Sequence, residues 1–170
     1  TLGLIGIASF DKKVVFYNPS KNVVALTINL DNCSAHTLKF SKEYSFLFAA
    51  TFGHIFKVFQ VDKARDYTQV AKLETPATTT AIEIFEDYNM VITCDDEGNL
   101  KSWDYRTFKS LQHYMLHSNC PVSKIIHIDG TKKFCVVTNR LNFFDFGQVV
   151  SYHEKNSQVV PSIQYIPEKE

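Results

Sequence analysis

Glycine and proline are scarce in this 170-residue sequence, which contains six and five of them, and there is one tryptophan. The sequence has no Gly-rich phosphate loop and no G-x-S-x-G nucleophile elbow, so we expect no cofactor. The formal net charge is zero, which argues against a nucleic-acid binder or a polybasic membrane-surface protein. No apolar run approaches the ~20 residues of a membrane-spanning helix. We therefore expect neither nucleic acid nor membrane as a partner.

Cysteine is also sparse, and its spacing excludes a familiar metal site. None of the four cysteines forms a C-x-x-C pair, so no zinc-binding spacing is present. Cys94 and Cys135 lie in apolar runs, where a free thiol behaves as a small hydrophobic side chain. Reduced thiols, and hence a cytoplasmic location, are the expectation.

Aromatic residues and short β-prone runs are plentiful by contrast. The chain has 14 phenylalanines and eight tyrosines, and no stretch of twelve or more residues shows a 3.6-residue apolar period. Residues 90–94 form an apolar run that is followed by Asp95-Asp96-Glu97-Gly98 and then by alternating residues up to Trp103 and Asp104. This pattern predicts two strands joined by a tight turn, in which Gly98 takes a positive φ.

The ten residues 95–104 have three further copies in the chain. Residues 9–18 and 51–60 fit the same template without a gap, and residues 138–145 fit it with two residues fewer. The aromatic residue near the end of each copy recurs at intervals of 42, 44 and 41 residues, at Tyr17, Phe59, Trp103 and Phe144. A period of ~40–45 residues is typical of blades in a β-propeller.

The template resembles the end of a WD repeat, the sequence unit of WD40-type β-propellers. This resemblance implies an all-β chain of about four blades, each a four-stranded antiparallel sheet. The markers of the blades are Tyr17, Phe59, Asp96, Trp103, Asp104, Phe144 and Asp145. We expect one propeller segment over residues 1–170, with blades at about 1–35, 36–76, 77–119 and 120–158, and with 159–170 as the first strand of a further blade or a ring closure.

Strand limits follow from the apolar runs and from the turn residues between them. The first unit is expected to lack its first strand, and the others to be complete. The expected strands are 2–9, 13–18 and 23–30; 36–41, 45–51, 54–60 and 67–74; 81–86, 90–94, 99–105 and 109–116; and 122–129, 132–138, 141–146 and 148–153.

In this family, each blade is often stabilised by a buried set of hydrogen bonds among four residues: a histidine, a serine or threonine, a turn aspartate and the tryptophan. No unit here has all four: the third has Asp96 and Trp103 without the histidine, and the second has His36 with Gly53 and Phe59 at the other positions. We therefore expect aromatic packing to replace much of that network. Whether four blades close a ring or belong to a larger propeller stays open, and the need of repeats to bury one another favours the larger propeller.

One set of residues predicts partner binding. The residue before the turn-aspartate position is Phe10 in the first unit and Phe52 in the second, and it corresponds to Asp95 and Asn139 in the next two. Two adjacent exposed phenylalanines on neighbouring blades would form an apolar patch. The same face would be polar on the next two blades, where the equivalent residues are polar. The alternative is that both rings pack between the blades.

Few residues suggest catalysis. His113 and His117 are four residues apart, a ligand spacing only on a helix, and this segment is expected to be a strand and the loop after it. A propeller enzyme with a metal in its central channel would need acids and histidines from several innermost strands. Glu83, His127 and Asp129 are the candidates, and they do not recur at equivalent positions.

The resemblance and the lack of a catalytic set predict a non-enzymatic scaffold for protein–protein interaction in a larger assembly. Residues 134–146 are similar to the shortened repeats of large WD proteins of the ciliary axoneme, which suggests the cytoskeleton of the cilium, with tubulin or axonemal partners. The alternatives are a channel-metal enzyme, a histone-tail or phosphopeptide reader, and a subunit of a trafficking coat or ubiquitin-ligase adaptor.

Overall fold

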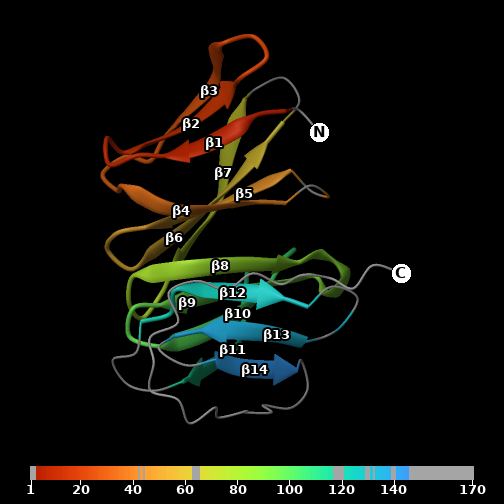
Figure 1. Ribbon diagram of the computed structural model, residues 1–170. Helices are drawn as coiled ribbons and strands as arrows, with labels where there is room; N and C mark the ends of the chain where they lie inside the picture. Colours follow the sequence, from red (N-terminus) through yellow and green to blue (C-terminus); the bar gives the residue numbers. More distant parts are fainter. Residues whose placement is uncertain are drawn as a thin grey trace.

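The described part of the chain folds into a series of four antiparallel β-sheets (Figure 1). The computed structural model describes residues 3–41, 43, 45–62, 66–116, 121–128, 131, 133–138 and 141–145, the last five as backbone alone. Each sheet is built from strands that follow one another in the sequence and pair in sequence order. The first and fourth sheets lie at opposite ends of the series, and the second and third lie between them (Figure 1).

The first and fourth sheets have three described strands, and the second and third have four. One 3₁₀ helix lies in the described ranges: η1 (Glu86–Tyr88) precedes β9 and ends on Asn89 in the left-handed conformation. The strands are β1 Ile5–Ala8, β2 Lys13–Asn18 and β3 Val23–Asn29 in the first sheet; β4 Ala35–Phe40, β5 Phe46–Thr51, β6 Ile55–Val61 and β7 Tyr67–Glu74 in the second; β8 Thr79–Phe85, β9 Met90–Asp95, β10 Asn99–Asp104 and β11 Ser110–Met115 in the third; and β12 Lys124–His127, β13 Lys133–Val137 and β14 Leu141–Asp145 in the fourth.

The predicted all-β class is confirmed for the described residues, whose strands form four antiparallel sheets. The first sheet has three strands, as expected, and every described strand coincides with a predicted one to within three residues at either end. Helix η1 was not predicted. The predicted strands 148–153 and 159–170 lie outside the described residues. Within the described part of the chain, the four sheets do not close into a ring.

The first described strand of each sheet lies next to the first described strand of the neighbouring sheet. β4 contacts β8, β8 contacts β12, and β1 contacts β4. Two threonine hydroxyls link neighbouring sheets: Thr37 on β4 donates to the Thr80 carbonyl on β8 at 3.2 Å, and Thr80 donates to the carbonyl of Val122, which precedes β12, at 2.5 Å. Consecutive sheets are therefore linked along one side and can pack face to face.

Each sheet has two faces, which we name the forward face, toward the following sheet, and the backward face, toward the preceding one. Because side chains alternate along a strand, neighbouring residues belong to opposite faces. Leu100 lies on the forward face of the third sheet and packs with Phe134 of the fourth, whereas Trp103 lies on its backward face and packs with Phe56 of the second. Both residues are buried, so a sheet between two others has no solvent-facing side at its centre.

Aromatic packing fills the interface between the second and third sheets, as expected from the incomplete hydrogen-bond set. Phe48 stacks on Phe56 at a centroid distance of 5.7 Å and on Tyr105 at 5.9 Å. The Phe46 ring meets the edges of Tyr105 and Phe108 at 5.7 and 5.4 Å. Such pairs contribute roughly 0.5–1.5 kcal/mol each beyond their buried area.

Candidate functional site

The predicted apolar patch lies on two hairpins from neighbouring sheets. Phe10 is in the turn between β1 and β2, and Phe52 is in the turn between β5 and β6. Their rings stack with centroids 5.5 Å apart and an angle of 24° between the planes. Phe10 is 77% exposed and Phe52 is 44% exposed, so these rings do not pack between the sheets. Two large aromatic side chains thus meet in solvent.

Ser34, in the connection from β3 to β4, holds both hairpins. Its hydroxyl donates to the Phe10 carbonyl at 2.9 Å, and its carbonyl accepts from the Phe52 amide at 3.0 Å. The backbones of both phenylalanines are therefore fixed by the same residue. A preorganised contact surface loses less entropy on binding than a flexible one.

His36 is a third member of this cluster, and the sequence did not place it there. Its ring lies 4.7 Å from the Phe52 ring, tilted by 55°, and its Nδ1 lies 3.1 Å from the Thr37 hydroxyl. Among the described residues, its buried Nε2 has no hydrogen-bond partner. Burial lowers the pKa of His36, and the nearby Asp96 carboxylate opposes this shift. A β-bulge between Ala35 and Thr37 sets the position of the ring, and no local sequence signal marks that bulge.

The structure corrects which residue of the third unit corresponds to Phe52. The Phe52 amide donates to Ser34, and the Asp96 amide donates in the same way to the Thr78 carbonyl at 3.1 Å. The counterpart of Phe52 is therefore Asp96, and the prediction of Asp95 was wrong by one position. The Asp96 carboxylate is exposed and accepts from the Thr78 amide at 3.1 Å.

Asp95 is an internal part of the turn instead of a partner contact. It is 2% exposed, and its carboxylate accepts from the Asn99 amide at 2.7 Å, the Asn99 side-chain amide at 2.9 Å and the Glu97 amide at 3.1 Å. Gly98 completes this turn with φ of +88°, as predicted. Asn139, the candidate from the fourth unit, lies outside the described residues.

Of the predicted markers, Trp103 and Phe59 lie in the sheet interfaces. The Trp103 indole N–H donates to the Thr93 hydroxyl at 2.9 Å, so a tryptophan and a threonine, two of the four residue types in the family's hydrogen-bond set, are joined here. Phe59 meets the Tyr67 ring edge-on at 6.0 Å. Tyr17 is half-buried, and its hydroxyl donates to the side chain of Asn22. Nothing is described for the side chains of the markers Phe144 and Asp145.

Asp104 closes the turn that follows β10. Its carboxylate accepts from the Thr107 amide at 2.7 Å, the Thr107 hydroxyl at 2.8 Å and the Arg106 amide at 3.0 Å. The hydrogen bond from the Thr107 amide is the main reason that the pKa of Asp104 lies below its usual value. Its role is structural, as the marker interpretation expected.

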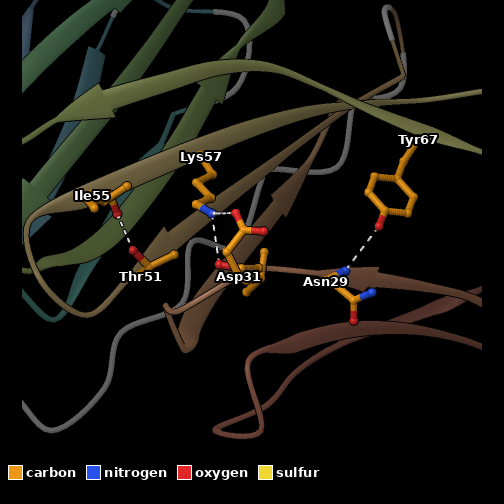
Figure 2. A network of polar contacts seen from close by, with 7 residues as sticks. Asn29, Asp31, Thr51, Ile55, Lys57 and Tyr67 are labelled. Atoms are coloured by element: carbon orange, nitrogen blue, oxygen red, sulfur yellow. Dashed lines mark hydrogen bonds and ion pairs between the residues drawn. The ribbon is translucent and has the colours of Figure 1, made fainter.

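A lysine links each of two sheets to the one before it, which the sequence did not predict. Lys57 on β6 is 3% exposed, and its Nζ donates to the Leu30 carbonyl at 2.8 Å and to Asp31 at 2.9 Å (Figure 2). The ammonium group lowers the pKa of Asp31. Lys101, at the same position of β10, reaches the Glu74 carbonyl at 3.5 Å and lies 4.3 Å from the Trp103 ring centroid.

The candidates for a channel metal do not come together in the described residues. Glu83 is bound to Lys39 at 2.8 Å, and the His127 ring nitrogen contacts the Thr131 carbonyl at 2.8 Å. Asp129 and His117 lie outside the described part, and His113 contacts the Asn99 side chain at 3.0 Å. No group of three His, Cys, Asp or Glu residues within the described ranges could hold a metal ion. No helix in these ranges is long and apolar enough to span a bilayer.

No protein-family model matches the chain, and no curated protein matches it at a significant level. The assignment of the candidate site therefore depends on the contacts and exposures described above.

Proposed function

We propose that this chain is a segment of a WD40-type β-propeller that acts as a non-enzymatic interaction platform. The support for the propeller is the series of antiparallel sheets, the contacts among the strands β4, β8 and β12, and the recurrence of the aromatic marker every 41–44 residues. A fold alone does not give a function, so the interaction role rests on the surface of the hairpins.

The observation that carries this role is the exposed stack of Phe10 and Phe52. Aromatic side chains, phenylalanine among them, are enriched in protein interfaces relative to the rest of the protein surface. Here two of them come from different sheets, share one backbone anchor at Ser34, and lie beside His36. The partner in this proposal is a protein of a larger cytoplasmic assembly, for which the axoneme of the cilium is the first candidate.

The test is a quantitative pull-down of the tagged full-length protein from separate soluble and cytoskeletal fractions, read by mass spectrometry. The double variant Phe10→Ala, Phe52→Ala should lose its main partner roughly tenfold or more, as expected for interface hot spots. The matched control is Met115→Ala, which removes an apolar side chain that is 65% exposed on β11 of the third sheet. Circular dichroism checks that each variant keeps its strands.

Retention of every partner by the double variant would contradict the proposed site. Recovery with tubulin and axonemal proteins supports the ciliary assignment. Recovery in the soluble fraction with coat, ligase or chromatin subunits rejects that assignment and keeps the platform.

A further inference from the structure

We infer that the outer edge of β11, in the third sheet, pairs with the same edge of a second copy of this chain. Among the described strands, β11 is hydrogen-bonded to β10 alone, and all six of its residues are exposed. An open strand edge presents unpaired N–H and C=O groups that another strand can bind. This edge belongs to the third sheet, whereas Phe10 and Phe52 lie on the first two, so the inference does not rest on the proposed function.

The hydrogen bonds of the third sheet show which backbone groups of β11 face outward. The Leu116 amide donates inward to the Gly98 carbonyl at 2.9 Å. In an antiparallel pair, residues that exchange hydrogen bonds with the partner strand alternate with residues that do not. Tyr114, two residues before Leu116, therefore bonds to β10. The amides and carbonyls of His113 and Met115 consequently point to the open edge.

The equivalent edge positions of the first two sheets are already occupied. Asn29 on β3 and Glu74 on β7 correspond to Met115 in the strand registers. The amide of Asn29 donates to the Tyr67 hydroxyl of the second sheet at 3.4 Å (Figure 2), and the carbonyl of Glu74 accepts from Lys101 of the third sheet at 3.5 Å. In both cases the following sheet supplies a side chain that blocks the edge.

The edge of β11 lacks these protecting features. The fourth sheet has Asn142 at the position of Lys101, an asparagine in place of a long cationic side chain. β7 carries Lys72 at the position of His113, and lysine is a residue by which natural edge strands avoid pairing. β11 itself contains no charged residue and no proline. Its outward groups are thus available to another strand.

A second copy fits this edge because the strand is complementary to itself about Tyr114. With a twofold axis at Tyr114, His113 lies opposite Met115 of the second copy, and this hydrogen-bonded pair occurs once on each side of the axis. The two Tyr114 rings, each 36% exposed, form a cross-strand aromatic pair, and no charged side chains of β11 oppose one another at neutral pH. An axis at His113 would instead use Leu111, which lies in the β-bulge of this strand.

The experiment is disulfide trapping of the full-length protein in a lysate of its own cells, under mild oxidation. Opposite residues that exchange no hydrogen bonds have Cα atoms about 4.5 Å apart, within the range of a disulfide. Tyr114→Cys should therefore cross-link two copies through residue 114, identified by peptide mapping because the native Cys33 is half-buried.

The matched control is Gln112→Cys, on the same face of the same exposed strand. In the inferred register, the two copies of residue 112 are four residues apart along the strands, about 14 Å, which is too far for a disulfide. The yield from Tyr114→Cys should exceed that from Gln112→Cys by roughly tenfold or more.

A second pair of variants tests whether the backbone edge makes the contact. In the Tyr114→Cys protein, Met115→Pro removes an outward amide that β10 does not use, so it should abolish the cross-link while circular dichroism shows the strands retained. Met115→Ala keeps this amide and should retain the cross-link. Equal yields at positions 112 and 114, a cross-link from residue 114 to a different protein, or a cross-link that survives Met115→Pro would overturn the inference.

Discussion

The hydrogen bond between Trp103 and Thr93 allows the sharpest test of how the sheets are stabilised. Both side chains are buried on the backward face of the third sheet, and the indole N–H donates to the hydroxyl at 2.9 Å. Thr93→Val keeps the shape of the side chain but removes the acceptor. The indole N–H then stays buried without a partner, which costs about 1–3 kcal/mol.

The expected cost has a second component that a double variant separates. The Thr93 hydroxyl also donates to the Lys101 carbonyl at 3.3 Å, so Thr93→Val loses that bond as well. Trp103→Phe removes the indole N–H and leaves a cavity, for a loss of roughly 2 kcal/mol. With both changes no indole donor is left unpaired, so the double variant should be more stable than the sum of the single losses predicts, by about 1 kcal/mol.

The assay is equilibrium unfolding in urea of the four proteins in this cycle, with Thr68→Val as a control. Thr68 is exposed on β7, so its replacement should change the free energy of unfolding by less than about 0.5 kcal/mol. For a chain of this size, a loss of 1 kcal/mol lowers Tm by about 2–4 °C. Strict additivity of the two single losses would refute the role assigned to this hydrogen bond.

Three further predictions concern charged and titratable groups. Lys57→Met should lower the free energy of unfolding, measured in urea, by about 1–2 kcal/mol, because a buried charge-assisted donor is lost. Asp31→Asn should lower it less, because Asp31 is exposed to solvent. A larger loss for Asp31→Asn than for Lys57→Met would contradict the role assigned to Lys57. His36 has a lowered pKa in the folded state, so as pH decreases the unfolded state binds a proton on this residue first. The free energy of unfolding should therefore fall as pH decreases below about 6.5. His36→Gln should flatten that part of the stability–pH curve, and an unchanged curve would show that His36 is not its cause. Burial raises the pKa of Cys94, so a thiol reagent at pH 8 should label the half-buried Cys33 well before Cys94 in the folded protein, and equal rates would show that the third sheet opens.

Much of the fold was predictable because its signals are local. Alternating apolar residues and turn residues such as those of 95–98 define strands and hairpins within a few residues of sequence. The period of the aromatic marker then divided the chain into units, and the described strands follow that division. The exposure of Phe10 and Phe52 was one of two alternatives, and only the structure chose between them.

The residues that the sequence misplaced depend on contacts between units. Asp95 and Asp96 are adjacent; the ungapped template aligns Asp96 with Phe52, and the hydrogen bond from the Asp96 amide to Thr78 shows that Asp95 was the wrong choice between them. Likewise, nothing near Lys57 in the sequence indicates that its ammonium group reaches the connection after β3, 27 residues away. Such partners are set by the packing of one sheet on another.

By itself, the sequence determined where the strands lie, how they group into units and which aromatic residue recurs in each unit. These features follow from alternation and turn chemistry, which act over a few residues. The tertiary structure alone decided which side chains meet across units and which backbone groups stay open: the stack of Phe10 on Phe52 with His36 beside it, the burial of Asp95, and the open edge of β11. The physical reason is that each sheet buries its faces only against a neighbouring sheet, so exposure is a property of the assembled series and not of any one repeat.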